Sequence, residues 1–522
     1  PMSRPKRRCG SPNIAKPRPS ETAEPVSLNS SSGSANCVIE LPKFEMVSPV
    51  QNFQKSARIV TQPTGSRAHT SVVPDTLDRY LEQHGDRFTS ELRELCAIPS
   101  EATDAGALDA AARWCGERLV SAGAESRELR VDGAPALVVG EVGAGKRTLI
   151  CVQHYDVQPA VPLDLWRSPP YDPAVRDGAV FARGVDDNKG HLLLRIQAVE
   201  AYRAIHGDLP LHVRFLIEGE EESGSTNLAR LLALDATLTD GDGALKEGGA
   251  IDAAGRPQLL LGGKGIFYVE LRVRSMARDA HSGAATHLPN AAWRLVTALD
   301  TLVDRGGRIL IDGFYDDVRP PTEAERAHLA SLPFEADVIK RLYGIDAFAW
   351  GRSDVEARLA SVYEPTCNIC GLISGFIEEG TKTVIPSEAS VKIDFRLVPE
   401  QDPARIGTLL RAHLDRRGFG DVELVAKEGT RPYRGRIDDP LVRAAQAVAE
   451  EEIGTPALLI PSSGGTSPMW QVCGKRSLAN VTLGMGHPGS GAHAPNENIL
   501  LANYWKALRA TVALFRRYAD QV

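Results

Sequence analysis

Two short apolar runs that end at potential metal ligands constrain the fold of this 522-residue chain more than any other feature. The run 148–152 is rich in branched residues and leads to His154, and the run 211–217 leads to four glutamates. A helical pattern from about 190 to 205, closed by Gly207, separates the two runs. Strand, helix and strand in this order predict an α/β fold with a mostly parallel sheet flanked by helices, which collects ligands at the carboxyl ends of its strands.

Five potential metal ligands follow apolar runs or stand beside glycine: His154, Asp187, Glu222, Glu247 and His493. Imidazole and carboxylate donors in this number and mixture suit a pair of divalent cations. The crowded glutamates at 218–222 are the strongest signal, because bound cations would relieve their repulsion at the mouth of a sheet. Two adjacent glutamates can also divide the work, one binding metal and one accepting a proton from water.

Most of these positions are weak signals when each is taken alone. Asp187 could belong to an acidic turn before a helix, and Glu247 could belong to a surface turn. His487 competes with His493 for the last position. The combination, rather than any one residue, predicts a two-metal hydrolase.

The pattern of apolar and polar residues changes along the chain. At 522 residues, the chain is also long enough for two domains. Apolar residues at helical spacing begin after Asp75, whereas the preceding tail is rich in Pro and Ser and carries ten Lys or Arg against four Glu. Alternating segments from about 265 to 430 predict an antiparallel sheet. We expect a disordered basic tail at 1–74, a metal-binding catalytic domain at 75–264 and 431–522, and an inserted smaller α+β domain at 265–430.

Charge and hydropathy argue against two classes of partner. Residues 75–522 carry 50 basic against 63 acidic residues, so we expect no nucleic-acid partner. No apolar stretch approaches the ~20 residues that cross a bilayer, so we expect no membrane partner. The eight cysteines are scattered, and a lone C-x-x-C at Cys367 and Cys370 is interpreted as buried and structural. These features favour a cytoplasmic protein.

Five short segments occur in the order of a known family: 154–159 (HYDVQP), 166–170 (WRSPP), 182–184 (ARG), 218–225 (EGEEESGS) and 382–386 (KTVIP). Across about residues 75–520 the chain resembles the co-catalytic di-metal peptidase family that includes carnosine dipeptidase, carboxypeptidase G, aminoacylase and acetylornithine deacetylase. The resemblance is closest to the dipeptidase branch.

The resemblance implies two divalent metal ions per subunit, with zinc as the first choice and manganese or cobalt as alternatives. His154 and Glu247 would bind one metal, and Glu222 and His493 would bind the other. Asp187 would bridge the two metals. The family also implies a cis peptide bond after this aspartate.

Further roles follow from the resemblance. Glu221 would be the general base, and Asp156 would orient the first histidine ligand. His281 would reach the partner subunit's site and hold the substrate carbonyl oxygen, which implies a homodimer. Arg396, with Thr383 nearby, would bind the terminal carboxylate of the substrate. Both lie in the inserted domain, which would thus serve as lid and dimerisation domain.

The resemblance predicts an enzyme that cleaves the amide bond of a dipeptide or similar small substrate with a free terminal carboxylate, by attack of a metal-bridging hydroxide. One departure is Ser463, which stands where carnosinase-like relatives have a glutamate near the substrate amine. That neutral residue, together with Glu247 in place of an aspartate, leaves an N-acyl amino acid deacylase open as an alternative. A non-catalytic dimeric scaffold and a metal store or sensor are further alternatives.

Overall fold

The computed structural model describes residues 76–521, so the predicted basic tail at 1–74 lies outside the described residues. The described residues belong to one compact unit. This unit contains a large central sheet and a second four-stranded sheet, each with its own hydrophobic core. The division into a catalytic domain and an inserted domain stays a prediction.

The central sheet has the strand order β1-β2-β6-β3-β7-β19. Its four strands from β6 to β19 are parallel neighbours, whereas β1 and β2 run antiparallel at one edge. The predicted mostly parallel sheet is therefore confirmed. The bounds of its strands are Glu125–Leu129 (β1), Leu137–Val142 (β2), Thr148–His154 (β3), His212–Glu218 (β6), Gly243–Lys246 (β7) and Asn480–Thr482 (β19).

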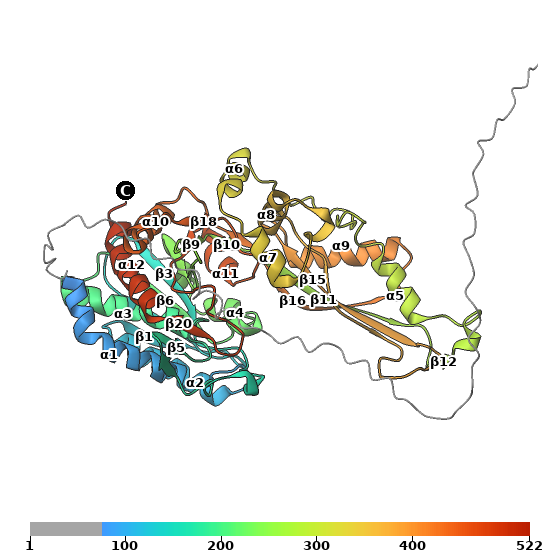
Figure 1. Cartoon of the computed structure of the whole chain (residues 1–522), viewed down its shortest axis with the longest axis horizontal. Helices are drawn as coiled ribbons and strands as arrows, with labels where there is room; N and C mark the ends of the chain where they lie inside the picture. Colours follow the sequence, from blue (N-terminus) through green and yellow to red (C-terminus); the bar gives the residue numbers. More distant parts are fainter. Residues whose placement is uncertain (1–75, 522) are drawn as a thin grey trace, which may run out of the picture. The chain divides into compact units, whose positions relative to one another are not determined.

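Helices cover both faces of the central sheet (Figure 1). Successive side chains of β3 point to opposite faces of the sheet. Those on one face, such as Cys151, belong to a larger hydrophobic core, and those on the other face, such as Val152, belong to a smaller one. Burial on both faces explains why this strand is a continuous apolar run. The helices of the larger core are α1 (Thr76–Cys96), α2 (Ala105–Ser121), α3 (Lys189–His206), α10 (Pro440–Ile453) and α12 (Leu501–Ala519); those of the smaller core are α4 (Leu228–Leu232) and α11 (Met469–Cys473).

None of the helices within residues 76–521 has both the length and the apolar composition that a membrane crossing requires.

Three small sheets hold the loops around the central sheet. In one of them β20 (Asn498–Leu500) pairs with β5 (Ala179–Phe181), which also pairs with β4 (Ala174–Arg176). The β5–β20 pair holds the segment that follows His493 beside the segment that leads to Asp187. The others join β8 (Ala250–Ile251), β9 (Pro257–Leu260) and β18 (Leu458–Ile460), and β10 (Gly262–Gly263) with β17 (Tyr433–Arg434).

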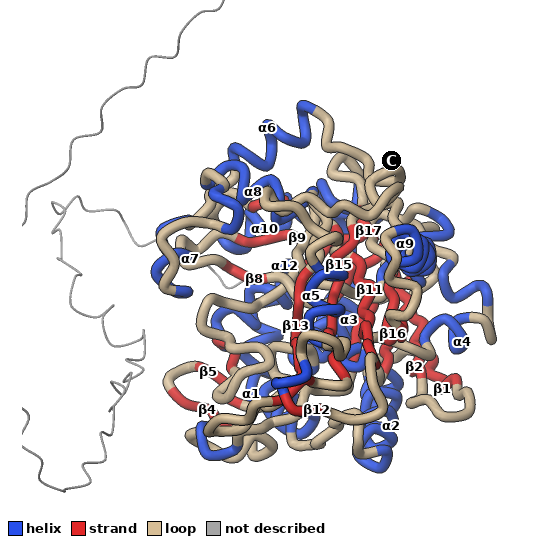
Figure 2. The backbone as a smooth tube through the Cα atoms, turned by 90° about the vertical axis from the view of Figure 1, so that its right-hand side faces the viewer, coloured by secondary structure: helices blue, strands red, loops and turns tan. Residues whose placement is uncertain are grey.

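The second sheet is antiparallel, as predicted, with the order β13-β15-β11-β16 (Figure 2). Apolar side chains of one face, such as Phe267 and Phe395, pack against α5 (Ala291–Leu299) and α9 (Pro403–Arg416), and the opposite face carries polar and charged side chains. Its strands are Gly265–Arg274 (β11), Asn368–Ser374 (β13), Glu388–Leu397 (β15) and Glu423–Thr430 (β16). Nearby elements are β12 (Ala280–His281), α5 (Ala291–Leu299), α6 (Glu323–Ser331), α7 (Ala336–Tyr343), α8 (Asp354–Tyr363), β14 (Val384–Ile385) and α9 (Pro403–Arg416).

The interpretation of the C-x-x-C pair as buried was wrong for one of its members. Cys367 is half-buried, but Cys370 is exposed on β13. The reason is that β13 pairs with β15 on one side and forms the outer edge of the second sheet.

The packing of β6 generates a stability prediction. Phe215 is fully buried in the larger core on the strand that leads to the glutamate cluster. Phe215→Ala should lower the free energy of unfolding by about 3–5 kcal/mol, because it removes buried apolar surface and leaves a cavity. Urea denaturation measures this change. Val175→Ala, at an exposed position, is the matched control and should change stability by less than about 0.5 kcal/mol.

Candidate metal centre

Asp187 lies between the two histidines that were predicted as ligands. Its Oδ1 atom is 3.1 Å from His154 Nε2, and its Oδ2 atom is 3.0 Å from His493 Nε2. Each histidine also approaches a second carboxylate: Glu247 Oε2 is 3.7 Å from His154 Nε2, and Glu222 Oε2 is 3.2 Å from His493 Nε2. The five predicted ligands therefore form two groups that share one carboxylate.

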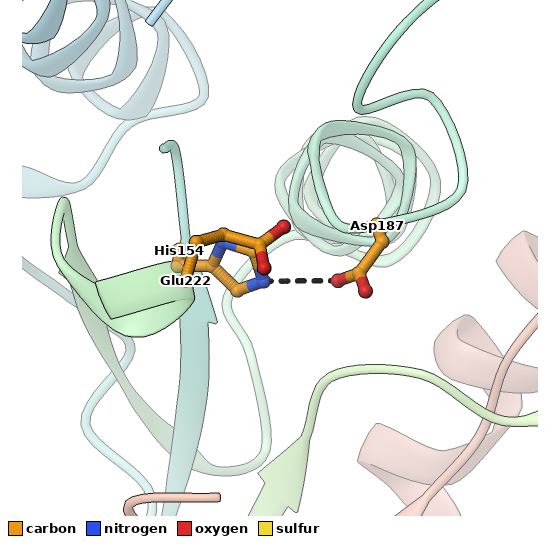
Figure 3. Close-up of side chains that lie close together, drawn as sticks. All are labelled: His154, Asp187 and Glu222. Atoms are coloured by element: carbon orange, nitrogen blue, oxygen red, sulfur yellow. Dashed lines mark hydrogen bonds and ion pairs between the residues drawn. The ribbon is translucent and has the colours of Figure 1, made fainter. Parts of the chain in front are cut away.

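The central sheet delivers most of these side chains, because parallel strands end at the same edge. His154 is the last residue of β3, and Glu247 directly follows β7. Glu222 lies in a short 3₁₀ turn after β6, and Asp187 lies just before α3 (Figure 3). The Asp187–Asn188 peptide bond is cis, as the resemblance implied.

The crowded carboxylates fit a site for cations. Donor atoms of His154, Asp187 and Glu222 lie within 4.8 Å of one another. Burial raises the pKa of Glu221 well above its usual range, and the neighbouring carboxylate of Glu247 raises it further. Burial also raises the pKa of Glu247. Divalent cations would offset the repulsion among these groups, and imidazole and carboxylate are donors that zinc, manganese and cobalt accept.

Asp156 connects the first histidine with the glutamate turn. His154 Nδ1 lies 3.1 Å from the backbone oxygen of Asp156 and 3.3 Å from its Oδ1 atom. The same carboxylate accepts the backbone N–H groups of Glu221, at 3.3 Å, and Glu222, at 3.0 Å. One fully buried side chain thus contacts a candidate ligand and the backbone of the candidate base.

Glu497 supports the Asp187 loop, and sequence reasoning gave it no role. Its carboxylate accepts the backbone N–H groups of Gly184, Asp186 and Asp187 at 2.8–3.0 Å and a guanidinium N–H of Arg183 at 2.7 Å. The side chain is fully buried. A buried carboxylate requires such partners. The signal that the sequence offered was an acidic residue directly before β20.

Two cavities border the group of ligands. The larger, of about 590 Å³, is lined by Glu221, Glu222 and His493 and also by Arg396. The smaller, of about 340 Å³, is lined by Asp187, Glu247 and the same Glu221 and His493. The candidate base therefore faces both cavities.

Arg396 reaches the larger cavity from β15. Its Nη1 group donates a hydrogen bond to Thr466 Oγ1 at 2.8 Å, and its Nε atom lies 3.3 Å from Asp394 Oδ2. Thr466 lines both cavities. The arginine predicted to bind a substrate carboxylate is therefore near the candidate base.

His281 and Thr383 lie together but outside these cavities. Their Nε2 and Oγ1 atoms are 3.3 Å apart, and β12 pairs with β14 beside them. Both side chains are exposed, and neither lines the larger or the smaller cavity. Their predicted functions are therefore not assembled within one chain, and the role of His281 in a partner subunit stays a prediction.

His487 was the competitor of His493. It lines the smaller cavity, but its Nε2 atom pairs with Asn498 Oδ1 at 3.0 Å. The structure places His493 beside Asp187.

The sequence profile of peptidase family M20/M25/M40 matches residues 151–519 of this chain. The chain belongs to this family. The family predicted from the sequence is therefore confirmed. Among its relatives, Beta-Ala-His dipeptidase of Homo sapiens is 30% identical over 474 residues, which cover 85% of this chain and 92% of that protein. Cys-Gly metallodipeptidase dug1 of Schizosaccharomyces pombe is 27% identical over 86% of this chain and 98% of that protein.

Solved structures of family members share the fold. The M20 family metallo-carboxypeptidase Sso-CP2 from Sulfolobus solfataricus is 35% identical, with a TM-score of 0.79 over 83% of this chain and 99% of that one. Human carnosine dipeptidase 1 is 28% identical, with a TM-score of 0.68 over 85% and 99%. Both matches extend across the central and the second sheet.

The contacts of Glu497 predict a loss of metal affinity on substitution. Glu497→Gln would place an amide donor against N–H groups that now meet carboxylate oxygens. Divalent metal affinity should fall about 10- to 100-fold, as measured by calorimetric titration of the metal-free protein. Glu451→Gln, which removes an exposed carboxylate on α10, is the control. Equal affinity in the two variants would show that the loop does not depend on Glu497.

Metal removal should destabilise the protein. Without cations, the carboxylates of Glu221, Glu247 and Asp187 repel one another in a largely buried site. A chelator should therefore lower the thermal midpoint, and zinc at 100 times its dissociation constant should restore about 2.7 kcal/mol. Differential scanning calorimetry measures both effects. His493→Ala should respond less to added zinc, and an equal response would argue against this histidine as a ligand.

Proposed function

We propose that this chain is a metal-dependent dipeptidase. The observation that carries the proposal is the position of Asp187 between two histidine–carboxylate pairs, beside a cavity that contains both Glu221 and Arg396. The relatives named as dipeptidases favour a dipeptide over an N-acyl amino acid as substrate. Family membership supports metal-dependent hydrolysis of an amide bond.

The proposed metal site holds two divalent cations. His154 and Glu247 would bind one, Glu222 and His493 would bind the other, and Asp187 would be shared. We propose zinc, with manganese and cobalt as the alternatives that the same donors accept. When bound, such cations polarise the substrate carbonyl and make a water molecule more acidic.

Glu221 is the proposed general base. It faces both cavities, so the acyl part of a substrate would lie on one side of it and the leaving residue on the other. Its carboxylate would take a proton from the attacking water and return that proton to the leaving nitrogen. Asp156 would keep His154 oriented through Nδ1 and would hold the backbone of the base.

Arg396 is the proposed ligand of the terminal carboxylate. Thr466 and Asp394 contact two of its nitrogen atoms, which limits the directions that the guanidinium plane can take. A planar guanidinium held in this way suits bidentate recognition of a carboxylate. Thr383 and His281 would act from the second subunit of a homodimer, because both are exposed and lie outside the cavities of their own chain.

We also propose a cytoplasmic location. The six cysteines in the described part of the chain are free thiols, which is usual in a reducing compartment. The proposal includes no nucleic-acid and no membrane partner.

Replacing the base separates catalysis from metal binding. Glu221→Gln keeps the shape of the side chain but removes the proton acceptor, so turnover of a dipeptide such as Ala-Gln should fall about 10²- to 10⁴-fold. The metal content, measured by elemental analysis, should stay at two ions per chain. Full activity in this variant would contradict the assigned base.

The same assay decides between the two substrate classes. Wild-type protein should hydrolyse Ala-Gln faster than acetyl-Gln, since both share the terminal carboxylate and differ in the acyl part. Preference for the acetylated compound would instead support the deacylase alternative. No hydrolysis of either compound by the metal-loaded protein would support the non-catalytic scaffold.

A further inference from the structure

We propose that Lys427 makes the larger cavity selective for a leaving residue with an acidic side chain. This inference rests on the proposed dipeptidase function and adds a substrate class to it. It also assigns a specificity role to a lysine of β16.

The lining of the larger cavity is chemically divided. Its only carboxylates among the described lining residues are Glu221 and Glu222, which lie at the end that holds the candidate metal ligands. The second sheet contributes two cations to the lining, Arg396 from β15 and Lys427 from β16. A dipeptide with one terminal carboxylate would use only one of these cations.

The strand register gives the backbone positions of the two cations. Arg396 pairs with Ile266 of β11, and Ile266 pairs with Thr430 of β16, so these residues form one row across three strands. Two strand steps separate the backbones of Arg396 and Thr430 by about 9.6 Å. Lys427 precedes Thr430 by three residues, next to an irregularity in the β11–β16 register. Lys427 therefore lies about 10 Å along β16 from the row of Arg396. Its side chain, that of Arg396 and Ile266 line the same cavity.

The lining of the larger cavity matches the chemistry of a C-terminal glutamate or aspartate. Its terminal carboxylate would lie on Arg396, its methylene groups would contact the half-buried Ile266, and its side-chain carboxylate would meet the ammonium of Lys427. Charge-assisted contacts at both ends with an apolar contact between them would fix the leaving residue in one orientation.

Lys427 is also free to exchange its present partner. Its Nζ atom lies 3.5 Å from Glu270 Oε2. The same Glu270 carboxylate already accepts hydrogen bonds from Arg272 at 2.9 and 2.8 Å. A substrate carboxylate could therefore take over the ammonium while Glu270 keeps its arginine.

The charge balance of the site supports this assignment. Two divalent cations would balance Asp187, Glu221, Glu222 and Glu247, and Asp394 lies beside Arg396. With Glu270 held by Arg272, Lys427 supplies the excess positive charge of the cavity wall. A substrate with a second negative charge compensates it, whereas a neutral side chain does not.

A matched pair of substrates tests the inference. Ala-Glu and Ala-Gln have nearly the same shape and differ in the charge of the leaving residue. For metal-loaded wild-type protein, kcat/KM should be about fivefold higher for Ala-Glu. Lys427→Met should reduce this ratio to about one, with the larger loss of kcat/KM on Ala-Glu, and Lys427→Arg should retain the preference.

Lys392→Met is the matched control. Lys392 pairs with Glu270 in the register of β15 and β11 and is exposed, but it does not line the cavity. This variant should keep the preference for Ala-Glu, which separates a local contact from a general effect of surface charge. Loss of the preference in Lys392→Met to the same extent as in Lys427→Met would overturn the inference.

The remaining outcomes distinguish the two proposals. Hydrolysis of Ala-Gln without a preference for Ala-Glu would overturn the role of Lys427 and leave the dipeptidase proposal standing. A preference that survives in Lys427→Met would do the same. Failure of the metal-loaded wild-type protein to hydrolyse either dipeptide would overturn both.

Discussion

The candidate site depends on one shared carboxylate. Asp187 can lie between His154 and His493 only if its loop is held against the rest of the protein, and the buried Glu497 provides that support through backbone N–H groups. Glu497 follows His493 by four residues, and β20 follows Glu497 directly. One segment therefore supplies a candidate ligand and fixes the position of the carboxylate that this ligand approaches.

The two sheets make different contributions to the site. The central sheet brings acidic and imidazole groups together, because the parallel strands β3, β6 and β7 end at one edge. The second sheet presents cations, Arg396 and Lys427, on the face that its helices leave open. Thr466 accepts a hydrogen bond from Arg396 of the second sheet and also lines both cavities beside the candidate metal ligands. Positive and negative groups thus line the same cavity.

The ligands could be predicted from the sequence because strand ends are visible in it. An apolar run followed by a histidine or an acid marks both the element and the position of the side chain, as at His154 and Glu222. Glu497 could not be assigned in this way, since its partners lie more than 300 residues earlier in the chain. Cys370 was misjudged because the outer strand of a sheet has the same local pattern as an inner one.

The sequence by itself determined the parallel sheet, the antiparallel second sheet and the identity of the candidate metal ligands, because periodicity and residue chemistry are local properties. Only the tertiary structure decided how Glu497 supports the Asp187 loop and which cations line the cavity. Those choices depend on pairings such as β5 with β20 and β11 with β16, which join residues distant in the chain. The spacing of residues in the sequence does not show which distant segments lie side by side. The packing of the two hydrophobic cores determines this.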